Sequence, residues 1–219
     1  QTAPLNGRSA GCRGRTTLGG VTAEHTLPVA GASQRRRTRR DEILEIAVDL
    51  FATRGYHGVS MDDIGTAAGV TGPALYHHFA GKEAMLAAAI TPVSEELLAE
   101  GRKRTAEASE PGAALEALVG FHVAFAIDNP AVITLQLHEL ARLPEDSRRT
   151  IRRLQRLYVE EWVTAITRAR PAMAAAEARI AAHAAFGLMN STPFLDSELD
   201  RDRVSELLRR MTLVALLGE

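Results

Sequence analysis

The sequence has one cysteine, Cys12, and aromatic residues make up only 5% of its 219 residues. A single thiol cannot form an internal disulfide, so the fold depends on an apolar core, and such a chain suits a reducing cytoplasm. We find no run of about 18 apolar residues and no apolar leader segment, so neither a membrane span nor a secretory signal is expected. The sequence therefore predicts a cytoplasmic protein without a membrane partner.

Catalytic motifs are also missing. The sequence contains no phosphate-binding loop, no GxSxG nucleophile motif, no HExxH motif and no cluster of cysteine and histidine. His77 and His78 are adjacent, but neighbouring side chains on a helix point apart and chelate poorly. We therefore predict no catalytic site, no metal site and no cofactor.

Charge is distributed unevenly, although the net charge is only −1. Residues 1–40 carry eight arginines and one glutamate, a balance of +7, whereas residues 91–219 carry 16 basic and 19 acidic residues, a balance of −3. Residues 1–36 lack periodicity and are predicted to be a disordered basic arm. The arm is either an inert tail or a phosphate-contacting segment. We favour the inert role for residues 1–30 and phosphate contact for residues 35–40.

The segment 60–82, SMDDIGTAAGVTGPALYHHFAGK, predicts two short helices joined by a tight turn, with a third helix starting at its end. Ser60 and Asp63 have the spacing of a capping box. Gly69 ends the first helix, and Thr71 is placed to cap the second. Leu75 is predicted to point inward, which leaves the other side chains of the second helix facing outward. Such a helix-turn-helix can place its second helix in a DNA major groove.

Residues 39–90, RRDEILEIAVDLFATRGYHGVSMDDIGTAAGVTGPALYHHFAGKEAMLAAAI, resemble the DNA-binding domain of the TetR/AcrR transcriptional regulators. The blocks ILEIAVDLFATRGY, GVTGPALYHHF and GKEAML carry the resemblance, which covers about a quarter of the chain. The resemblance identifies residues 37–82 as the helix-turn-helix domain, and it implies that residues 83–219 bind a ligand and form a dimer. With the basic arm at 1–36 and the helices that periodicity predicts, we expect an all-α fold of about nine helices.

The predicted DNA contacts combine hydrogen-bond donors with small residues that allow close approach. Lys82 lies near a helix N-terminus, where the helix dipole disfavours a cation, so a DNA phosphate is the expected partner, with a solvated lysine as the alternative. Asp62 occupies a position where some relatives present a basic base-reading residue, so DNA shape should carry much of the specificity. The predicted set is Arg39, Arg40, Ser60, Thr71, Gly72, Pro73, Ala74, Tyr76, His77, His78 and Lys82.

Beyond residue 82 the periodicity predicts helices over residues 82–105, 111–128, 131–143, 145–170, 172–190 and 200–217, after a first helix over 38–54. Pro92 is expected to kink the first of these long helices. The basic run at residues 148–156 is either a solvated face or a second nucleic-acid patch, and we favour the solvated face.

The resemblance also implies a small-molecule site among the fourth to eighth helices. Apolar walls with a few polar groups suit a lipophilic effector, and an acyl-CoA or a fatty acid is favoured over a drug-like inducer. Plain core packing is the alternative for each aromatic residue. The predicted lining is Phe121, His122, Phe125, Gln136, His138, Tyr158, Trp162, Phe186, Met189 and Asn190.

The last two predicted helices carry a small-residue face and an apolar stripe, which favour a homodimer over an internal core. The sequence thus predicts a ligand-responsive transcriptional regulator that is a repressor released from a palindromic operator. The alternatives are a ligand-independent regulator or an activator, and, less favoured, a helical enzyme or a protein-binding scaffold.

Overall fold

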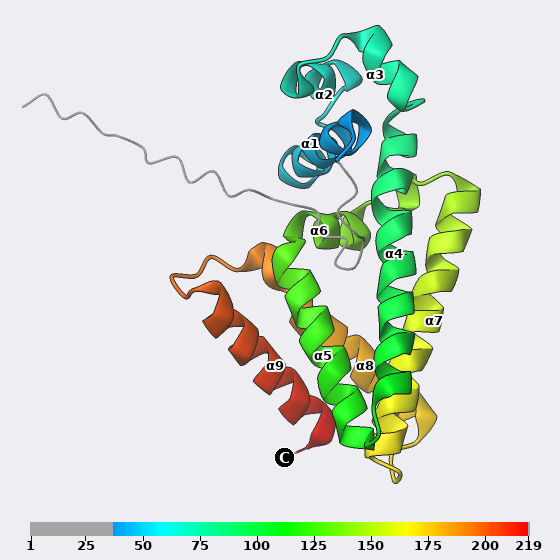
Figure 1. The fold of residues 1–219 in the computed structure, drawn as a ribbon, viewed down its shortest axis with the longest axis vertical. Helices are drawn as coiled ribbons and strands as arrows, with labels where there is room; N and C mark the ends of the chain where they lie inside the picture. The colour runs from blue at the N-terminus through cyan, green and yellow to red at the C-terminus, as the bar shows by residue number, and fades with distance from the viewer. Residues whose placement is uncertain (1–36, 219) are drawn as a thin grey trace, which may run out of the picture.

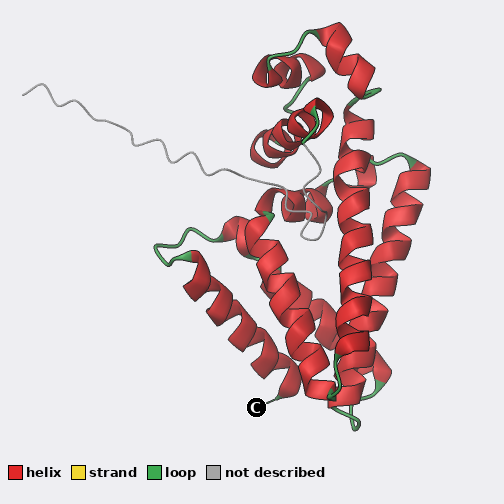
Figure 2. Ribbon diagram, viewed as in Figure 1, coloured by secondary structure: helices red, strands yellow, loops and turns green. Residues whose placement is uncertain are grey.

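The computed structural model describes residues 37–218, and every regular element in that range is helical (Figures 1 and 2). The predicted arm, residues 1–36, lies outside the described residues. The elements are α1 (Arg39–Arg54), α2 (Met61–Ala68), α3 (Gly72–His78), α4 (Lys82–Glu107), α5 (Pro111–Asp128), α6 (Pro130–His138), η1 (Leu140–Arg142), α7 (Glu145–Ala169), α8 (Ala175–Met189), η2 (Thr192–Phe194) and α9 (Arg201–Leu217). The predicted all-α fold class is confirmed.

The short helices α1 and α2 begin at complete capping boxes. Thr38 accepts from the backbone of Asp41 at the start of α1, and Ser60 accepts from the backbone of Asp63 at the start of α2. In each box the aspartate carboxylate accepts from the backbone N–H of the cap residue. Aspartate is one carbon shorter than the usual glutamate, and both bonds of the box nevertheless form. Gly69 then ends α2 in the left-handed conformation, at φ 64°, where a side chain would be strained.

A small core holds α1, α2 and α3 together. Ile43 and Phe51 on α1, Ile64 on α2 and Leu75 on α3 are all 2% exposed or less, and Phe79 is buried directly after α3. These residues come from three helices and the C-cap of the third, so their burial holds α1, α2 and α3 in one arrangement.

The longest helix, α4, connects this small core to the rest of the molecule (Figure 1). Its first part packs against α1, and its later part packs against α5 and α7. Pro92 lies inside the helix, and α4 nevertheless runs without interruption from Lys82 to Glu107. The expected kink and the domain boundary after residue 82 stay predictions, because α4 belongs to both packing units.

Helices α5, α7, α8 and α9 form the second packing unit, together with the lower part of α4 (Figure 1). The predicted helix over 131–143 is too long, since α6 ends at His138 and a 3-10 turn follows. The predicted helix over 172–190 begins too early, because the Glu177 carboxylate accepts from the Ala174 backbone and sets the start of α8 at Ala175.

Helix α5 is apolar and long enough to span a membrane by length and composition alone. Here it packs against α4, α7 and α9, and side chains such as Leu115 and Val123 are fully buried between them. The apolar character of α5 is therefore that of a core helix.

Gly101 allows α7 to approach α4 closely. A Cβ atom added to Gly101 would lie 2.7 Å from Cε2 and 3.0 Å from Cδ2 of Tyr158, whose ring is buried. Such distances are too short for an ordinary contact, so either the ring or the helix would have to move.

We expect Gly101→Ala to destabilise the protein, since overpacking costs about 1–3 kcal/mol and the gain in helix propensity is at most about 1 kcal/mol. Gly112→Ala is the matched control, because no heavy atom lies within 4 Å of the added Cβ there. Urea unfolding followed by circular dichroism would measure both changes. Equal stability of the two variants would show that the Tyr158 contact is not tight.

Candidate functional site

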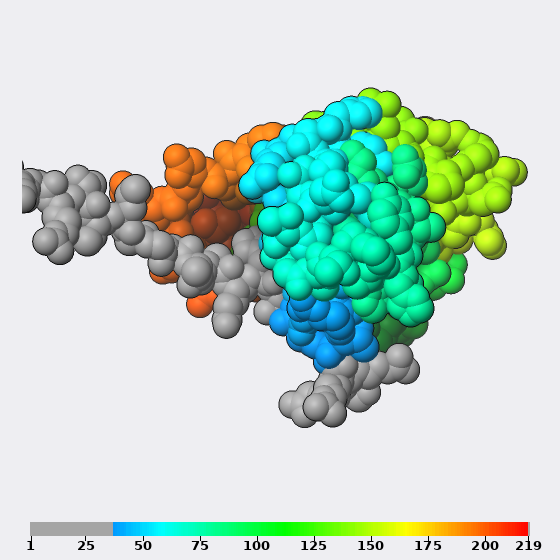
Figure 3. Space-filling model, turned by 90° about the horizontal axis from the view of Figure 1, so that it is seen from above, coloured from blue at the N-terminus to red at the C-terminus, as the bar shows by residue number. Residues whose placement is uncertain are grey.

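The exposed side of α3 forms one end of the molecule. Seen from above, α2 and α3 face the viewer and no other described element covers them (Figure 3). Leu75 is fully buried, whereas Tyr76 is 56% exposed and Pro73 and His77 are also exposed. Gly72, Ala74 and His78 are partly buried. The structure thus brings the predicted residues of α3 together on one surface, which we call the α3 face.

Thr71 and Ser60 stand at the starts of α3 and α2 but use their hydroxyls differently. The Ser60 hydroxyl is engaged with the carboxylate of Asp63, which it approaches to 2.5 Å, and these bonds lower the pKa of that carboxyl. Thr71 occupies the cap position of α3 without making a side-chain cap bond, which differs from the sequence prediction. Its exposed hydroxyl is therefore available to an outside partner.

The two predicted arginines brace α1 against its neighbours. Arg39 donates to Glu42 at 2.6 Å and also to the backbone carbonyl of Ala68 at the end of α2. The Arg40 guanidinium lies over the Phe79 ring, 4.4 Å from its centroid. Both side chains are largely exposed, so each can hold the fold and still face a polyanion.

The Lys82 ammonium has partners within the protein. It donates to the backbone carbonyls of Tyr56 at 2.7 Å and Val59 at 2.6 Å, and lies 4.3 Å from the centroid of the Tyr56 ring. These groups offset the unfavourable dipole at the start of α4 without any phosphate. Two of the three ammonium protons are used in this way, and the predicted phosphate contact would need the third.

A second candidate site lies between α5, α7 and α8, where four aromatic rings meet. The rings of His122 and Trp162 each lie 5.0 Å from that of Phe186, and Tyr158 stacks on His122 at 5.8 Å. His122 Nδ1 is 3.2 Å from the Tyr158 hydroxyl, and its Nε2 is 3.0 Å from Oδ1 of Asn190. We call this group the aromatic cluster.

The hydrogen bonds of His122 define its state. The Asn190 oxygen can only accept, so Nε2 carries the proton and Nδ1 accepts from the Tyr158 hydroxyl. Burial lowers the pKa of His122 to about 4, and the bond to Asn190 only partly opposes this change. Burial likewise raises the pKa of Tyr158 above its usual range. Both groups are therefore neutral at pH 7.

Two buried donors among the predicted lining residues lack a good acceptor. The indole N–H of Trp162 and the amide nitrogen of Gln136 make no hydrogen bond within residues 37–218. Trp162 is fully buried, although its N–H is close enough to Tyr158 to oppose slightly the rise in that hydroxyl's pKa. A buried donor without a partner costs roughly 1–3 kcal/mol, so a ligand oxygen that accepted from it would recover that free energy.

The structure does not gather all ten predicted lining residues. Phe125 and Met189 are buried near the aromatic cluster, whereas His138 is exposed at the end of α6. Phe121 is covered by the Arg104 guanidinium of α4, 4.4 Å from its ring centroid. The role of these residues in binding stays a prediction.

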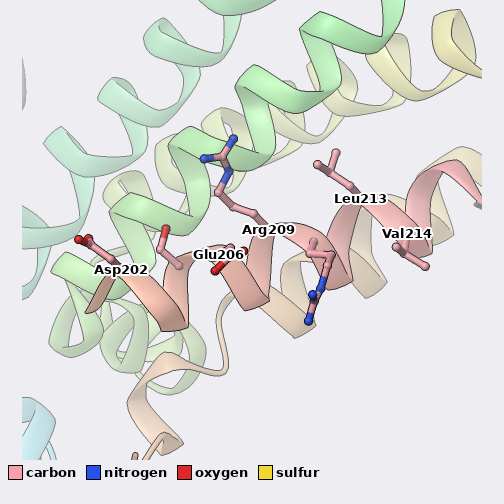
Figure 4. Close-up of a pocket in the computed structure, with 7 residues that line it drawn as sticks. Asp202, Glu206, Arg209, Leu213 and Val214 are labelled. Atoms are coloured by element: carbon pink, nitrogen blue, oxygen red, sulfur yellow. The ribbon is translucent and has the colours of Figure 1, made fainter. Parts of the chain in front are cut away.

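The outer surfaces of α8 and α9 expose large apolar side chains. Ile180 on α8 is 72% exposed, and Met211 and Val214 on α9 are 46% and 51% exposed. With Leu207 the exposed residues of α9 recur at spacings of four and three, which makes one stripe. Figure 4 shows Arg209 on a different side of α9, extended toward α5. The apolar stripe is therefore left without a partner in one copy of residues 37–218.

Two protein-family models match the chain. One, described as bacterial regulatory proteins of the tetR family, matches residues 43–89, and the other, a tetracyclin repressor-like C-terminal domain, matches residues 108–194. A solved TetR-family regulator from Bordetella parapertussis superimposes with a TM-score of 0.75 and 29% identity, over 81% of this chain and 93% of that one. The complex of AibR with isovaleryl coenzyme A and operator DNA shares the fold, with a TM-score of 0.68 and 24% identity over 80% of this chain and 97% of that one.

Curated proteins match over shorter segments. The transcriptional repressor KstR2 of Rhodococcus jostii is 38% identical over 94 residues, which is 43% of this chain and 46% of the relative. The transcriptional activator FasR of Mycolicibacterium smegmatis is 47% identical over 47 residues, 22% of either chain. The matched segments thus span less than half the length of these relatives.

We expect the stability of the protein to fall between pH 6.5 and pH 4 through His122. In that range His122 of the unfolded chain binds a proton more readily than the buried imidazole of the folded protein. The free energy of unfolding therefore falls by about 3 kcal/mol when the pH reaches 4. His122→Gln removes this part of the pH dependence, whereas His183→Gln, at an exposed imidazole, keeps it. Urea unfolding of the three proteins at pH 7 and pH 4 measures the difference, and identical pH dependence in all three would contradict a buried neutral His122.

Proposed function

This chain belongs to the TetR family of bacterial transcriptional regulators, which are not enzymes, and from that premise we propose that it is a cytoplasmic DNA-binding repressor released from its operator by a small lipophilic effector. The observation that carries the proposal is the α3 face. A buried Leu75 holds a short helix whose tyrosine and histidine side chains are exposed, and the preceding helix α2 starts at a complete capping box.

The α3 face suits the major groove of DNA. Tyr76 and His77 offer a hydroxyl and an imidazole, and the free hydroxyl of Thr71 adds a donor at the start of the helix. Pro73, with Gly72 and Ala74 beside it, leaves little bulk between the backbone and the DNA. Helix α3 has no arginine or lysine, so we propose that phosphate contacts and DNA shape supply much of the specificity.

A homodimer would place two α3 faces on one side of a duplex. We propose that the apolar stripe of α9 and Ile180 of α8 form its interface, because burying these exposed side chains removes apolar area from water. A twofold protein matches an inverted repeat whose half-sites lie about one turn, roughly 34–36 Å, apart.

The aromatic cluster supplies the proposed effector site. Its rings offer apolar contact, and the indole N–H of Trp162 offers a hydrogen bond to a ligand oxygen. The Tyr158 ring also packs on Gly101 of α4, the helix whose other end carries α3. A ligand that displaced Tyr158 would thus favour a different position of α4, and DNA affinity would fall by the ratio of ligand affinities for the two states. An acyl-CoA or fatty acid is the proposed class, and the solved AibR complex, with isovaleryl coenzyme A, is a precedent on the same fold.

An activator is the second candidate function. It rests on the similarity of 47 residues to FasR, which is named as an activator. The position of the operator separates the two roles, since a site overlapping the promoter blocks the polymerase and a site upstream of it can recruit the polymerase.

Selection of bound DNA from a random pool, with the purified full chain, tests the proposal. We expect an enriched inverted repeat, and we expect fatty acids or acyl-CoA thioesters to reduce the enrichment. Absence of any enriched sequence at low salt would contradict the proposed function and favour a protein-binding scaffold.

The α3 face itself can be tested with Tyr76→Ala and His77→Ala combined. We expect operator affinity to fall roughly tenfold or more, because base or phosphate contacts are lost while Leu75 keeps α3 in place. Leu137→Ala with His138→Ala is the matched control, since this pair is also exposed and adjacent but lies on α6. Fluorescence anisotropy with labelled operator measures both, and a similar loss in the two variants would argue against the α3 face.

The dimer interface predicts that Met211→Asp with Val214→Asp yields a monomer near 23.6 kDa, because charged groups in a buried interface lose hydration. Arg210→Gln, one position along α9 from Met211 and outside the apolar stripe, should leave the dimer intact. Analytical ultracentrifugation gives the mass of each variant. A wild-type monomer, or a dimer that survives both aspartates, would place the interface elsewhere.

A further inference from the structure

A groove of about 450 Å³ runs between α7 and α8 on the outside of the second packing unit. Helix α7 contributes Arg152, Arg156 and Val159, and α8 contributes Arg179 and His183. The sequence pattern had favoured a solvated face for the basic run to which Arg152 and Arg156 belong. In the structure both side chains are exposed, as that interpretation expects, and they also line a concave surface, which we call the α7/α8 groove.

The charges of the α7/α8 groove do not cancel. Glu160 is the one carboxylate among its lining residues, and Arg179 binds it at 2.7 Å and 2.8 Å through one nitrogen. Arg152 and Arg156 have no carboxylate partner within residues 37–218, whereas Arg149 on the same helix pairs with Asp146. Three arginines and one glutamate leave a balance of +2. Two adjacent guanidinium groups without anions are suited to bind one.

The α7/α8 groove adjoins the aromatic cluster. Val159 lies three residues before Trp162 on α7, and His183 lies three residues before Phe186 on α8, so each pair shares one side of its helix. Trp162 and Phe186 are in ring contact at 5.0 Å. From Trp162 back to Arg156 the helix rises about 9 Å, and to Arg152 about 15 Å. An elongated molecule is long enough to span this distance, and it would have to part α7 from α8 to reach the aromatic cluster, because Trp162 is fully buried.

We propose that the α7/α8 groove binds the anionic end of an elongated effector, with Arg152 and Arg156 as its ligands and the apolar end directed at the aromatic cluster. This inference rests on the proposed function and narrows the effector to amphiphiles with a phosphate or carboxylate group. Both groups accept two parallel hydrogen bonds from a guanidinium. A fatty acid would supply its carboxylate, and an acyl-CoA would supply phosphates that lie beyond its pantetheine arm.

The chain has a single tryptophan, Trp162, so its fluorescence reports binding at the aromatic cluster directly. The full-length protein is titrated with decanoic acid, decanoyl-CoA, coenzyme A and neutral decanamide. Arg152→Gln with Arg156→Gln is compared with Arg149→Gln with Arg153→Gln, which removes two charges from the same helix outside the α7/α8 groove. Circular dichroism and unfolding midpoints confirm that both double variants are folded.

We expect the Arg152 and Arg156 variant to lose roughly tenfold or more in affinity for an anionic probe, with a weaker salt dependence, while decanamide binding is unchanged. The control variant should stay within about twofold of the wild type. If the Arg152 and Arg156 variant binds decanoic acid more weakly than the wild type, the two arginines bind a carboxylate. If only decanoyl-CoA binds more weakly, the two arginines bind phosphates.

Equal affinity of the wild type and the Arg152 and Arg156 variant for both anionic probes would overturn the proposal, as would equal losses in the two double variants or no binding of either anionic probe. Operator binding by the same samples distinguishes failure of the anion site from failure of the proposed function. Intact operator binding with arginine-independent effector release rejects the anion site and retains the repressor, whereas loss of operator binding in the wild type rejects the proposed function itself.

Discussion

The Lys82 ammonium ties the start of α4 to the loop that precedes α2, and the position of α3 depends on this contact. Its bonds to the carbonyls of Tyr56 and Val59 join residues more than twenty positions apart in the sequence. The cation also lies on the Tyr56 ring, so the charge is stabilised from two sides. Helix α4 continues without interruption beyond this point, so no loop separates the Lys82 contact from the second packing unit.

The other end of the same helix meets the proposed effector site. Gly101 lets the Tyr158 ring lie directly on the backbone of α4, and Tyr158 is hydrogen-bonded to His122 within the aromatic cluster. Packed groups of this kind change position in discrete steps because no empty space is available for gradual movement. The contact between Gly101 and Tyr158 therefore joins the proposed effector site directly to α4, the helix that continues to the helix-turn-helix.

Polar groups inside this apolar region give it chemical selectivity. The buried imidazole of His122 is neutral and satisfied by Tyr158 and Asn190, while the N–H of Trp162 is left without a good acceptor. A ligand oxygen beside Trp162 would gain a hydrogen bond and compete only with the weak interaction between this N–H and the Tyr158 hydroxyl. Arg152 and Arg156 lie at the surface and face water, which is the basis for proposing an effector with one apolar and one anionic end.

The local pattern of the sequence was sufficient for the fold class, the capping box of Ser60 and Asp63, the left-handed Gly69 and the outward α3 face, because each depends on residues within a few positions of one another. The same pattern predicted a phosphate partner for Lys82 and a solvated face for Arg152 and Arg156. Only the tertiary structure supplied the carbonyls that hold Lys82 and the neighbouring α8 that turns the two arginines into a groove. Hydrogen bonds and concave surfaces between distant segments depend on how helices pack, and helical periodicity describes one helix at a time.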